Sequence, residues 1–337
     1  MRNTRIVTII CWAVSALALT GLVVWFLVGN VFGVGFGFDF GLGNFDVVGE
    51  HSVSANDIDS LSIDWTSGAV YVGTHSGSDI QITEFSRRDL RDGEELSFNT
   101  DDSTLSIYFT ENMRRFSIGI NNFSKQLEVL IPHALSDDFD RFHVNTVSGR
   151  VLVSNIEAED FNVRTTSGRI ELRDITAPRL TAATTSGRIE LFDIASANLN
   201  ASTTSGRIEI TDIEADEIQL RTVSGRIEAR RTQADSLRTN TTSGRHELAG
   251  SFGYVNARST SGRIEITSAE VPERLTARAS SGRIAVTVPN EGAITVQYST
   301  GSGRFTSELP VTTGGGANAQ FDLSTSSGRI EIFALRG

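Results

Sequence analysis

From residue 141 onward, apolar and polar residues alternate in short runs, and the runs recur about every 19 residues. The tripeptide Ser-Gly-Arg marks each of ten repeats, and the best-formed unit reads L-x-A-x-T-T-S-G-R-I-E-L-x-D-I. An alternation with a period of two is typical of a strand with one buried face. Each unit therefore predicts two short strands around a Ser-Gly corner. The corner glycines are Gly149, Gly168, Gly187, Gly206, Gly225, Gly244, Gly262, Gly282, Gly303 and Gly328.

A unit of about 19 residues cannot close a core alone, but stacked units can share one continuous core. The predicted fold is all-β, a parallel β-solenoid (β-helix) of about ten 19-residue rungs. Glycine suits the corner because it adopts a positive φ without steric cost. With rungs about 4.8 Å apart, nine intervals predict a rod roughly 45 Å long.

The region before the repeats follows the pattern once. Residues Leu61 to Val72 have the same register around Gly68 and predict a degenerate first rung. Residues 79–132 depart from it and predict a capping or inserted β-region. Its strand-like runs are Asp79–Phe85, Glu95–Asn99, Thr104–Thr110 and Gln126–Ile131. We therefore divide this part of the chain into an N-terminal β-region at 50–140 and the Ser-Gly-Arg solenoid at 141–337.

The first 28 residues have the features of a membrane anchor. Ile6 to Val28 is an apolar run long enough for one transmembrane helix, and Arg2 and Arg5 precede it. By the positive-inside rule, we expect a single-pass cell-membrane protein with a cytoplasmic N-terminus and an extracytoplasmic C-terminal domain. The alternative is a signal peptide cleaved near Ala18. Residues 29–49 form a Gly/Phe-rich linker after the 1–28 anchor.

The composition and the absence of known motifs argue against several classes of function. The net charge is −11 and the pI is near 5.0, which argues against a nucleic-acid partner. The single cysteine, Cys11, excludes a disulfide within the chain. No two of the five histidines have metal-ligand spacing, and no nucleophile-elbow, zinc or calcium-loop motif is present. We expect no cofactor, no metal site and no enzymatic activity.

Two charged columns follow the corners. Arg follows every corner glycine, and Glu follows two residues later in most units, so both project from the same strand face. The plain interpretation is a solvated ion-pair ladder. The alternative is an arginine stripe for an anionic envelope polymer, with Arg150, Arg283 and Arg304 as the candidate ligand surface because Glu is missing beside them.

Other recurring polar positions have simpler interpretations. Thr three residues before the glycine points inward by parity and is expected to bond the corner backbone. Asp174, Asp193 and Asp212 form a short outward column, expected at a solvated turn edge, although it could bind a cation weakly. His246 replaces the isoleucine of the repeat and is expected in the core or at a corner.

The T-x-S-G-x-I-x-L units, the Leu61–Val72 segment and the Leu127–Pro132 strand resemble a bacterial family of cell-envelope proteins. It is the β-strand-repeat domain of unknown function named "putative adhesin", and the resemblance spans roughly residues 50–337. It implies a repeat-built β fold and an adhesin-like or structural role, with no catalytic residues to transfer. Members commonly have Asp or Asn where this chain has Arg, so no shared ligand is implied.

The expected function is thus a membrane-anchored, non-enzymatic envelope module whose partner is an envelope polymer or surface protein. The alternatives are a component of envelope-stress sensing and a carbohydrate-active β-helix enzyme. The enzyme would require a local cluster of acids standing out from the repeat.

Overall fold

The computed structural model describes residues 45–109, 125–137, 139–312 and 319–335. They belong to one compact unit, Phe45–Gly337, in which every regular element described is a β-strand. The helix predicted at residues 6–28 lies outside the described residues. Among the described residues, no helix has the length and apolar character needed to span a bilayer. Strand β1 (Asp46–Ser54) begins within the range assigned to the 29–49 linker.

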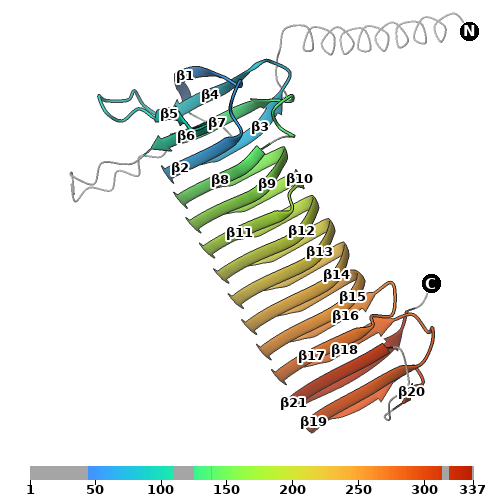
Figure 1. Cartoon of the computed structure of the whole chain (residues 1–337). Helices are drawn as coiled ribbons and strands as arrows, with labels where there is room; N and C mark the ends of the chain where they lie inside the picture. The colour runs from blue at the N-terminus through green and yellow to red at the C-terminus, as the bar shows by residue number, and fades with distance from the viewer. Residues whose placement is uncertain (1–44, 110–124, 138, 313–318, 336–337) are drawn as a thin grey trace, which may run out of the picture. The chain divides into compact units, whose positions relative to one another are not determined.

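The repeats stack as parallel rungs, as predicted (Figure 1). Equivalent residues pair from rung to rung, so Ile189 lies beside Ile208 and Ile208 beside Ile227. The two short strands expected in each unit are often joined into one strand of 17 residues that runs between successive corners. The rung strands are β8 (Phe139–Ser148), β9 (Val151–Ser167), β10 (Ile170–Thr176), β11 (Arg179–Ser186), β12 (Ile189–Ser205), β13 (Ile208–Ser224), β14 (Ile227–Ser243), β15 (His246–Ser261), β16 (Ile264–Ser268), β17 (Arg274–Ser281) and β18 (Ile284–Val288).

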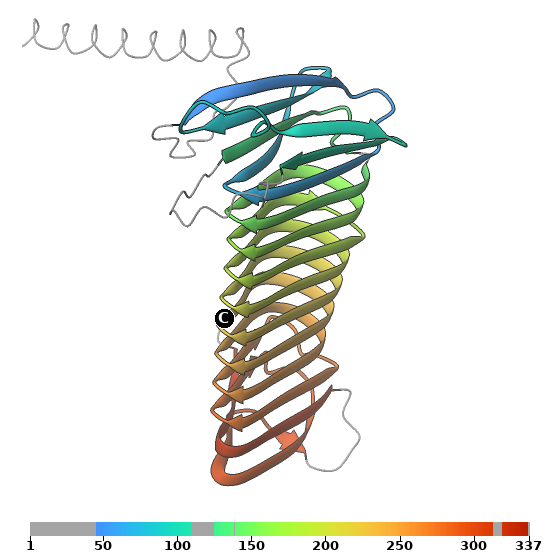
Figure 2. The same ribbon diagram turned by 90° about the vertical axis from the view of Figure 1, so that its left-hand side faces the viewer.

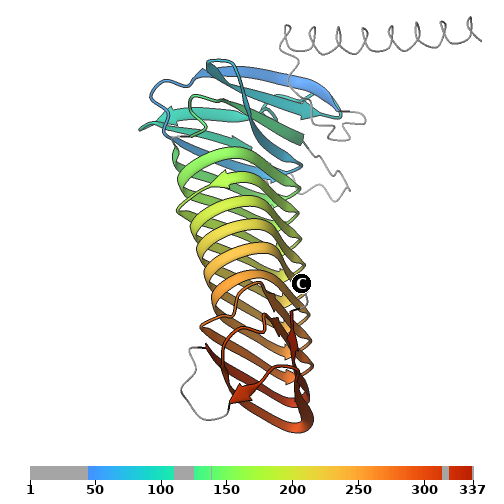
Figure 3. The same cartoon turned by 90° about the vertical axis from the view of Figure 1, so that its right-hand side faces the viewer.

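A second corner lies six residues after the glycine in five successive rungs. The residues there have left-handed φ angles of 46° to 59°, and they are Asn155, Asp174, Asp193, Asp212 and Arg231. Asn and Asp tolerate this conformation better than most residues. The predicted Asp column is therefore a column of backbone corners, and the rungs appear as parallel arcs along the rod in Figure 3.

The core is one continuous column of apolar side chains inside the rungs. The burial of β13 alternates along its second half, with Ile218 and Leu220 inside and Glu217 and Arg221 outside. Stacked rungs bring like side chains together: the Phe142 and Phe161 rings are parallel, with centroids 4.7 Å apart. The alternation read from the sequence thus matches the inside and outside of the rod.

The N-terminal end begins with the expected degenerate rung. Strands β2 (Ser60–Ser67) and β3 (Val70–His75) pair in parallel with β8 and β9, with Ser67 opposite Ser148. Strand β4 (Asp79–Ser86) pairs antiparallel with β1 and with β7 (Lys125–Pro132), and β5 (Ser97–Asp101) pairs antiparallel with β6 (Thr104–Phe109). Figure 2 shows these strands covering one end of the rod, which agrees with the predicted capping region.

The C-terminal rungs do not stack in chain order. Strand β21 (Ala319–Ala334) pairs with β17 and β18 on one side and with β19 (Ile294–Ser307) on the other. The corner glycines therefore follow the order Gly282, Gly328, Gly303. Figure 1 shows β21 between β17 and β19. The short strand β20 (Val311–Thr312) pairs with the start of β19. The 25-residue spacing before the last corner is the sequence feature that accompanies this reversal.

Candidate functional site

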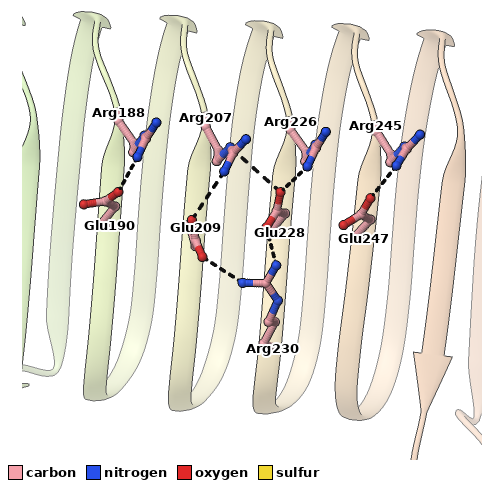
Figure 4. Close-up of polar contacts among 9 residues, drawn as sticks. All are labelled: Arg188, Glu190, Arg207, Glu209, Arg226, Glu228, Arg230, Arg245 and Glu247. Atoms are coloured by element: carbon pink, nitrogen blue, oxygen red, sulfur yellow. Dashed lines mark hydrogen bonds and ion pairs between the residues drawn. The ribbon is translucent and has the colours of Figure 1, made fainter.

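The arginines after the corners are bound to glutamates of the same and neighbouring rungs (Figure 4). Arg188 donates to Glu190 over 2.9 Å, and Arg226 donates to Glu228 over 2.8 Å. Arg230, five residues after its own corner, bridges Glu209 and Glu228 and so ties two rungs together. These contacts confirm that both columns project from the same face.

The ladder is less solvated than expected from the sequence. The Glu228 side chain is only 2% exposed, and the arginines around it are 37–50% exposed. The arginines therefore cover the carboxylates. Burial alone would raise the pKa of Glu171, but hydrogen bonds from Arg173 and Arg150 lower it below the usual value. The ladder is a set of shielded ion pairs with its cations outermost.

The structure tests whether the three candidate arginines lack a carboxylate partner, as the missing Glu beside each of them predicted. Arg150 is paired with Glu171 of the next rung, and Arg283 is paired with Glu331. The expectation that a missing Glu leaves these two unpaired is wrong, because neighbouring rungs supply the carboxylate. Arg304 lies on the terminal rung, is exposed, and has no ion pair with any described residue. Arg283 and Arg304 lie two rungs apart at one end of the stack and Arg150 lies in the first Ser-Gly-Arg rung, so a ligand surface shared by all three stays a prediction.

Part of the threonine column has the structural role predicted for it, whereas the hydroxyls of Thr146 and Thr165 have no hydrogen-bond partner among the described residues. Thr184, Thr203 and Thr222 donate to the carbonyl oxygens of the preceding corner glycines over 3.4, 3.3 and 3.2 Å. Each of these threonines is less than 8% exposed. These three hydroxyls therefore satisfy corner backbone inside the rod and are not available to a ligand.

A different face of the rod presents its polar groups to solvent. We call it the pre-corner face: the outward side chains six, four and two residues before each corner glycine. On β12 these are Asn200, Ser202 and Thr204. From the Gly168 rung to the Gly282 rung this face contains Asn, Gln, Thr, Ser, Ala, Val and Arg, with no Asp or Glu. The alternation predicts that these side chains point outward. No charged residue recurs in every rung of this face, so the sequence did not mark it as a candidate site.

Several arginines on the pre-corner face have no carboxylate partner. Arg221, Arg238 and Arg258 are exposed and make no ion pair with any residue that the structure describes. By contrast, the arginines after the corners of the Gly149 to Gly282 rungs are all ion-paired; they are Arg150, Arg169, Arg188, Arg207, Arg226, Arg245, Arg263 and Arg283. The pre-corner face thus presents arginines that are free to meet a ligand.

A shallow pocket of about 390 Å³ lies at the second corners near the N-terminal cap. Its lining includes His133, Asp137, Glu157 and Asp174. Desolvation and a hydrogen bond with Asp193 raise the pKa of Asp174. No group of three or more His, Cys, Asp or Glu suited to a metal ion occurs in the part of the chain that the structure describes.

Lys125 and His246 are ionisable side chains that lie fully inside the core. Lys125, the only lysine of the chain, is fully buried, is ion-paired with Glu84 and lies 3.5 Å from the centre of the Phe109 ring. Desolvation lowers the pKa of this amine. His246 is also fully buried, as predicted from its replacement of isoleucine, and burial lowers its pKa to about 4. Nothing in the sequence indicated that Lys125 would be inside.

The stacked rungs and their repeated corners define a parallel β-solenoid, and comparison of the sequence with family models identifies its family. The family model described as Toastrack DUF4097 matches residues 58–245 and 187–333. Because these matches span more than half of the chain, the protein belongs to the Toastrack DUF4097 family, a bacterial family of unknown function. The resemblance inferred from the T-x-S-G units is confirmed. No curated protein matches the chain.

Several solved structures are similar to this chain at low sequence identity. One from Parabacteroides distasonis, described as a putative adhesin, is 15% identical, with a TM-score of 0.47, covering 86% of this chain and 98% of its own. A second from that organism, described as a putative lipid binding protein, is 15% identical, with a TM-score of 0.43 and coverages of 86% and 97%. A putative adhesin from Parabacteroides merdae is 12% identical, with a TM-score of 0.45 and coverages of 86% and 97%.

Proposed function

We propose that this chain is a non-enzymatic envelope module, anchored in the membrane by residues 6–28, that holds an elongated β-solenoid outside the cytoplasm to bind an envelope polymer or surface partner. The anchor follows from the apolar run and from Arg2 and Arg5 before it. The solenoid suits display because stacked rungs present the same surface position repeatedly along one axis.

The observation that supports binding best is the pre-corner face. It is a row of outward side chains on paired parallel strands, rich in amides and hydroxyls, and several of its arginines have no ion-pair partner among the described residues. Charged groups elsewhere on the rungs are largely satisfied by one another, as in the Arg–Glu ladder of Figure 4. A repeated face with unsatisfied donors suits an extended partner rather than a small substrate.

The binding role is tested with the full-length chain in detergent. Purified protein is incubated with isolated cell-wall, capsule and membrane fractions of the cells that make it, and the bound protein is measured after sedimentation. We expect co-sedimentation with at least one polymer fraction, weaker at higher salt because arginine contacts are screened. Recovery of all protein in the supernatant with every fraction contradicts the binding role.

The anchored orientation is tested separately. Alkaline phosphatase folds only where its disulfides form, so a fusion after Gly337 reports an extracytoplasmic C-terminus. We expect an active fusion that remains with the membrane after a high-salt wash. An active fusion found only in the soluble extracytoplasmic fraction indicates cleavage, and an inactive fusion contradicts the orientation.

A further inference from the structure

Building on the proposed function, we infer that three consecutive rungs of the pre-corner face bind a linear acidic polysaccharide, one whose sugars have carboxylate groups. The site, which we call the basic patch, lies on β13, β14 and β15. Its residues are Gln219, Arg221, Arg238, Asn240, Asn256 and Arg258.

The strand register sets the arrangement of the patch. Gln219 lies opposite Arg238, which lies opposite Asn256. In the next column, Arg221 lies opposite Asn240, and Asn240 lies opposite Arg258. Each rung thus contributes one arginine and one amide, and the two alternate between the columns. The arginines form a zigzag along the rod axis with a step of about 4.8 Å per rung.

The charge environment of the patch favours an anion. None of its six positions is Asp or Glu, and the nearest carboxylate on the same strand face, Glu217, lies at the margin and makes no ion pair with these arginines. The chain as a whole has a net charge of −11. A carboxylate-free cluster of arginines on such a chain gives a locally positive field.

The patch also includes a contact that opposes folding. Arg258 lies directly opposite Arg278 on the neighbouring strand. Like charges directly opposite each other in a sheet are destabilising. Arg278 is relieved by Asp322, whereas Arg258 has no such partner among the described residues. An anion bound over Arg258 would remove this repulsion.

The side-chain chemistry selects an acidic sugar polymer among anions. The guanidinium fork of arginine matches a carboxylate with two parallel hydrogen bonds. The amides of Asn240, Asn256 and Gln219 each both donate and accept, which suits sugar hydroxyls between the charged groups. An extended sugar chain advances by roughly one rung per ring, so acidic and neutral contacts can recur in step with the strands. A polyphosphate would use the arginines but leave the amides without hydroxyl partners.

The test compares three full-length proteins in detergent: the wild type, the triple variant R221Q/R238Q/R258Q, and the control R87Q/R91Q/R141Q. The control removes the same charge from exposed arginines outside the patch, none of which is ion-paired with a described residue. The probes are polygalacturonate, polyphosphate of similar length and uncharged dextran. We expect wild type and control to bind polygalacturonate alike and the patch variant to bind about tenfold more weakly. Its thermal midpoint should match that of the wild type or exceed it.

Each other outcome overturns the inference. Equal binding by the patch variant excludes the patch, and equal weakening in the control makes net charge the cause. Equal or tighter binding of polyphosphate contradicts an acidic-sugar site. A wild type that binds envelope fractions but not polygalacturonate contradicts this inference and leaves the proposed function standing. A wild type that binds neither contradicts both.

Discussion

The close approach of consecutive rungs determines which residues fit at each corner. A Cβ placed on Gly206 would lie 1.8 Å from the carbonyl oxygen of Gly187, far inside van der Waals contact. Thr203 completes the corner by donating to that same oxygen over 3.3 Å. Glycine is needed at this position for space, and threonine gives the corner carbonyl a hydrogen-bond partner.

Replacing a corner glycine should therefore destabilise the fold strongly. We expect Gly206→Ala to lower the free energy of unfolding by about 3 kcal/mol or more, because backbone on both rungs must move. Gly49→Ala is the control, since its added Cβ meets nothing closer than 3.5 Å. Urea unfolding measures both. A Gly206→Ala protein as stable as the control would show that the rungs separate easily.

His246 makes the core sensitive to pH. Of the residues that the structure describes, only Thr239 is hydrogen-bonded to it, 2.8 Å from its Nδ1 atom, and its Nε2 atom has no partner among them. Burial lowers its pKa to about 4 from a usual value of 6.5. The unfolded chain binds the proton more readily, so stability is complete above pH 6.5 and falls as the pH drops toward 4.

The double variant T239A/H246I restores the Ala and Ile that other rungs have at these positions. We expect it to be about 1–2 kcal/mol more stable than the wild type at pH 7, because two buried polar groups are removed. The difference should grow by about 3 kcal/mol at pH 4. Urea titrations at both pH values measure this. A difference that does not change with pH would mean that His246 takes up a proton as readily in the folded protein as in the unfolded chain.

At the scale of the strand, the Arg–Glu ladder holds neighbouring rungs in register. Glu228 accepts from Arg226 and Arg230 and lies 3.8 Å from Arg207, while its side chain is 2% exposed. Among the described residues, Glu247 is ion-paired with Arg245 alone, and its side chain is 31% exposed. The same residue type at the same repeat position therefore differs in shielding: Arg230 covers Glu228, whereas Ala249 stands at the equivalent position beside Glu247.

We expect Glu228→Gln to cost about 2 kcal/mol, because three arginines lose a buried partner, and Glu247→Gln to cost less than about 1 kcal/mol. The two substitutions change the same charge, so each is the control for the other. Urea unfolding at neutral pH separates them. Equal costs would show that the ladder acts only through exposed, screened contacts.

Strand pairing explains what the sequence could and could not predict. Alternation and the 19-residue spacing were sufficient for the parallel rungs, the inward threonines and the rung around Gly68, because all three depend on local parity. The partners of Arg150 and Arg283 were missed because they belong to neighbouring rungs. The free arginines of the pre-corner face were missed because they occupy a column with no repeated residue type. Pairing across rungs depends on three-dimensional stacking, which one unit does not contain.

For the whole solenoid, the least expected feature is the order of the last rungs. Strand β21 is inserted between β17 and β19, so the last repeat in the chain is not the last in the stack. Thr276 lies opposite Asp322, and Asp322 lies opposite Gln297. The terminal rung is consequently β19, whose Tyr298 and Phe305 rings stack with centroids 4.1 Å apart and cover the end of the core.

Paired cysteines distinguish this order from simple chain order. In a Cys11→Ser background, we expect Thr276→Cys with Asp322→Cys to form a disulfide under mild oxidation, since adjacent strands lie about 4.8 Å apart. Thr276→Cys with Gln297→Cys should not, because two rung spacings exceed the roughly 7 Å limit between Cα atoms. Asp322→Cys with Gln297→Cys is the positive control, and peptide mass spectrometry detects each link. A bond between positions 276 and 297 together with none between 276 and 322 would mean that the rungs stack in chain order and that β21, not β19, closes the rod.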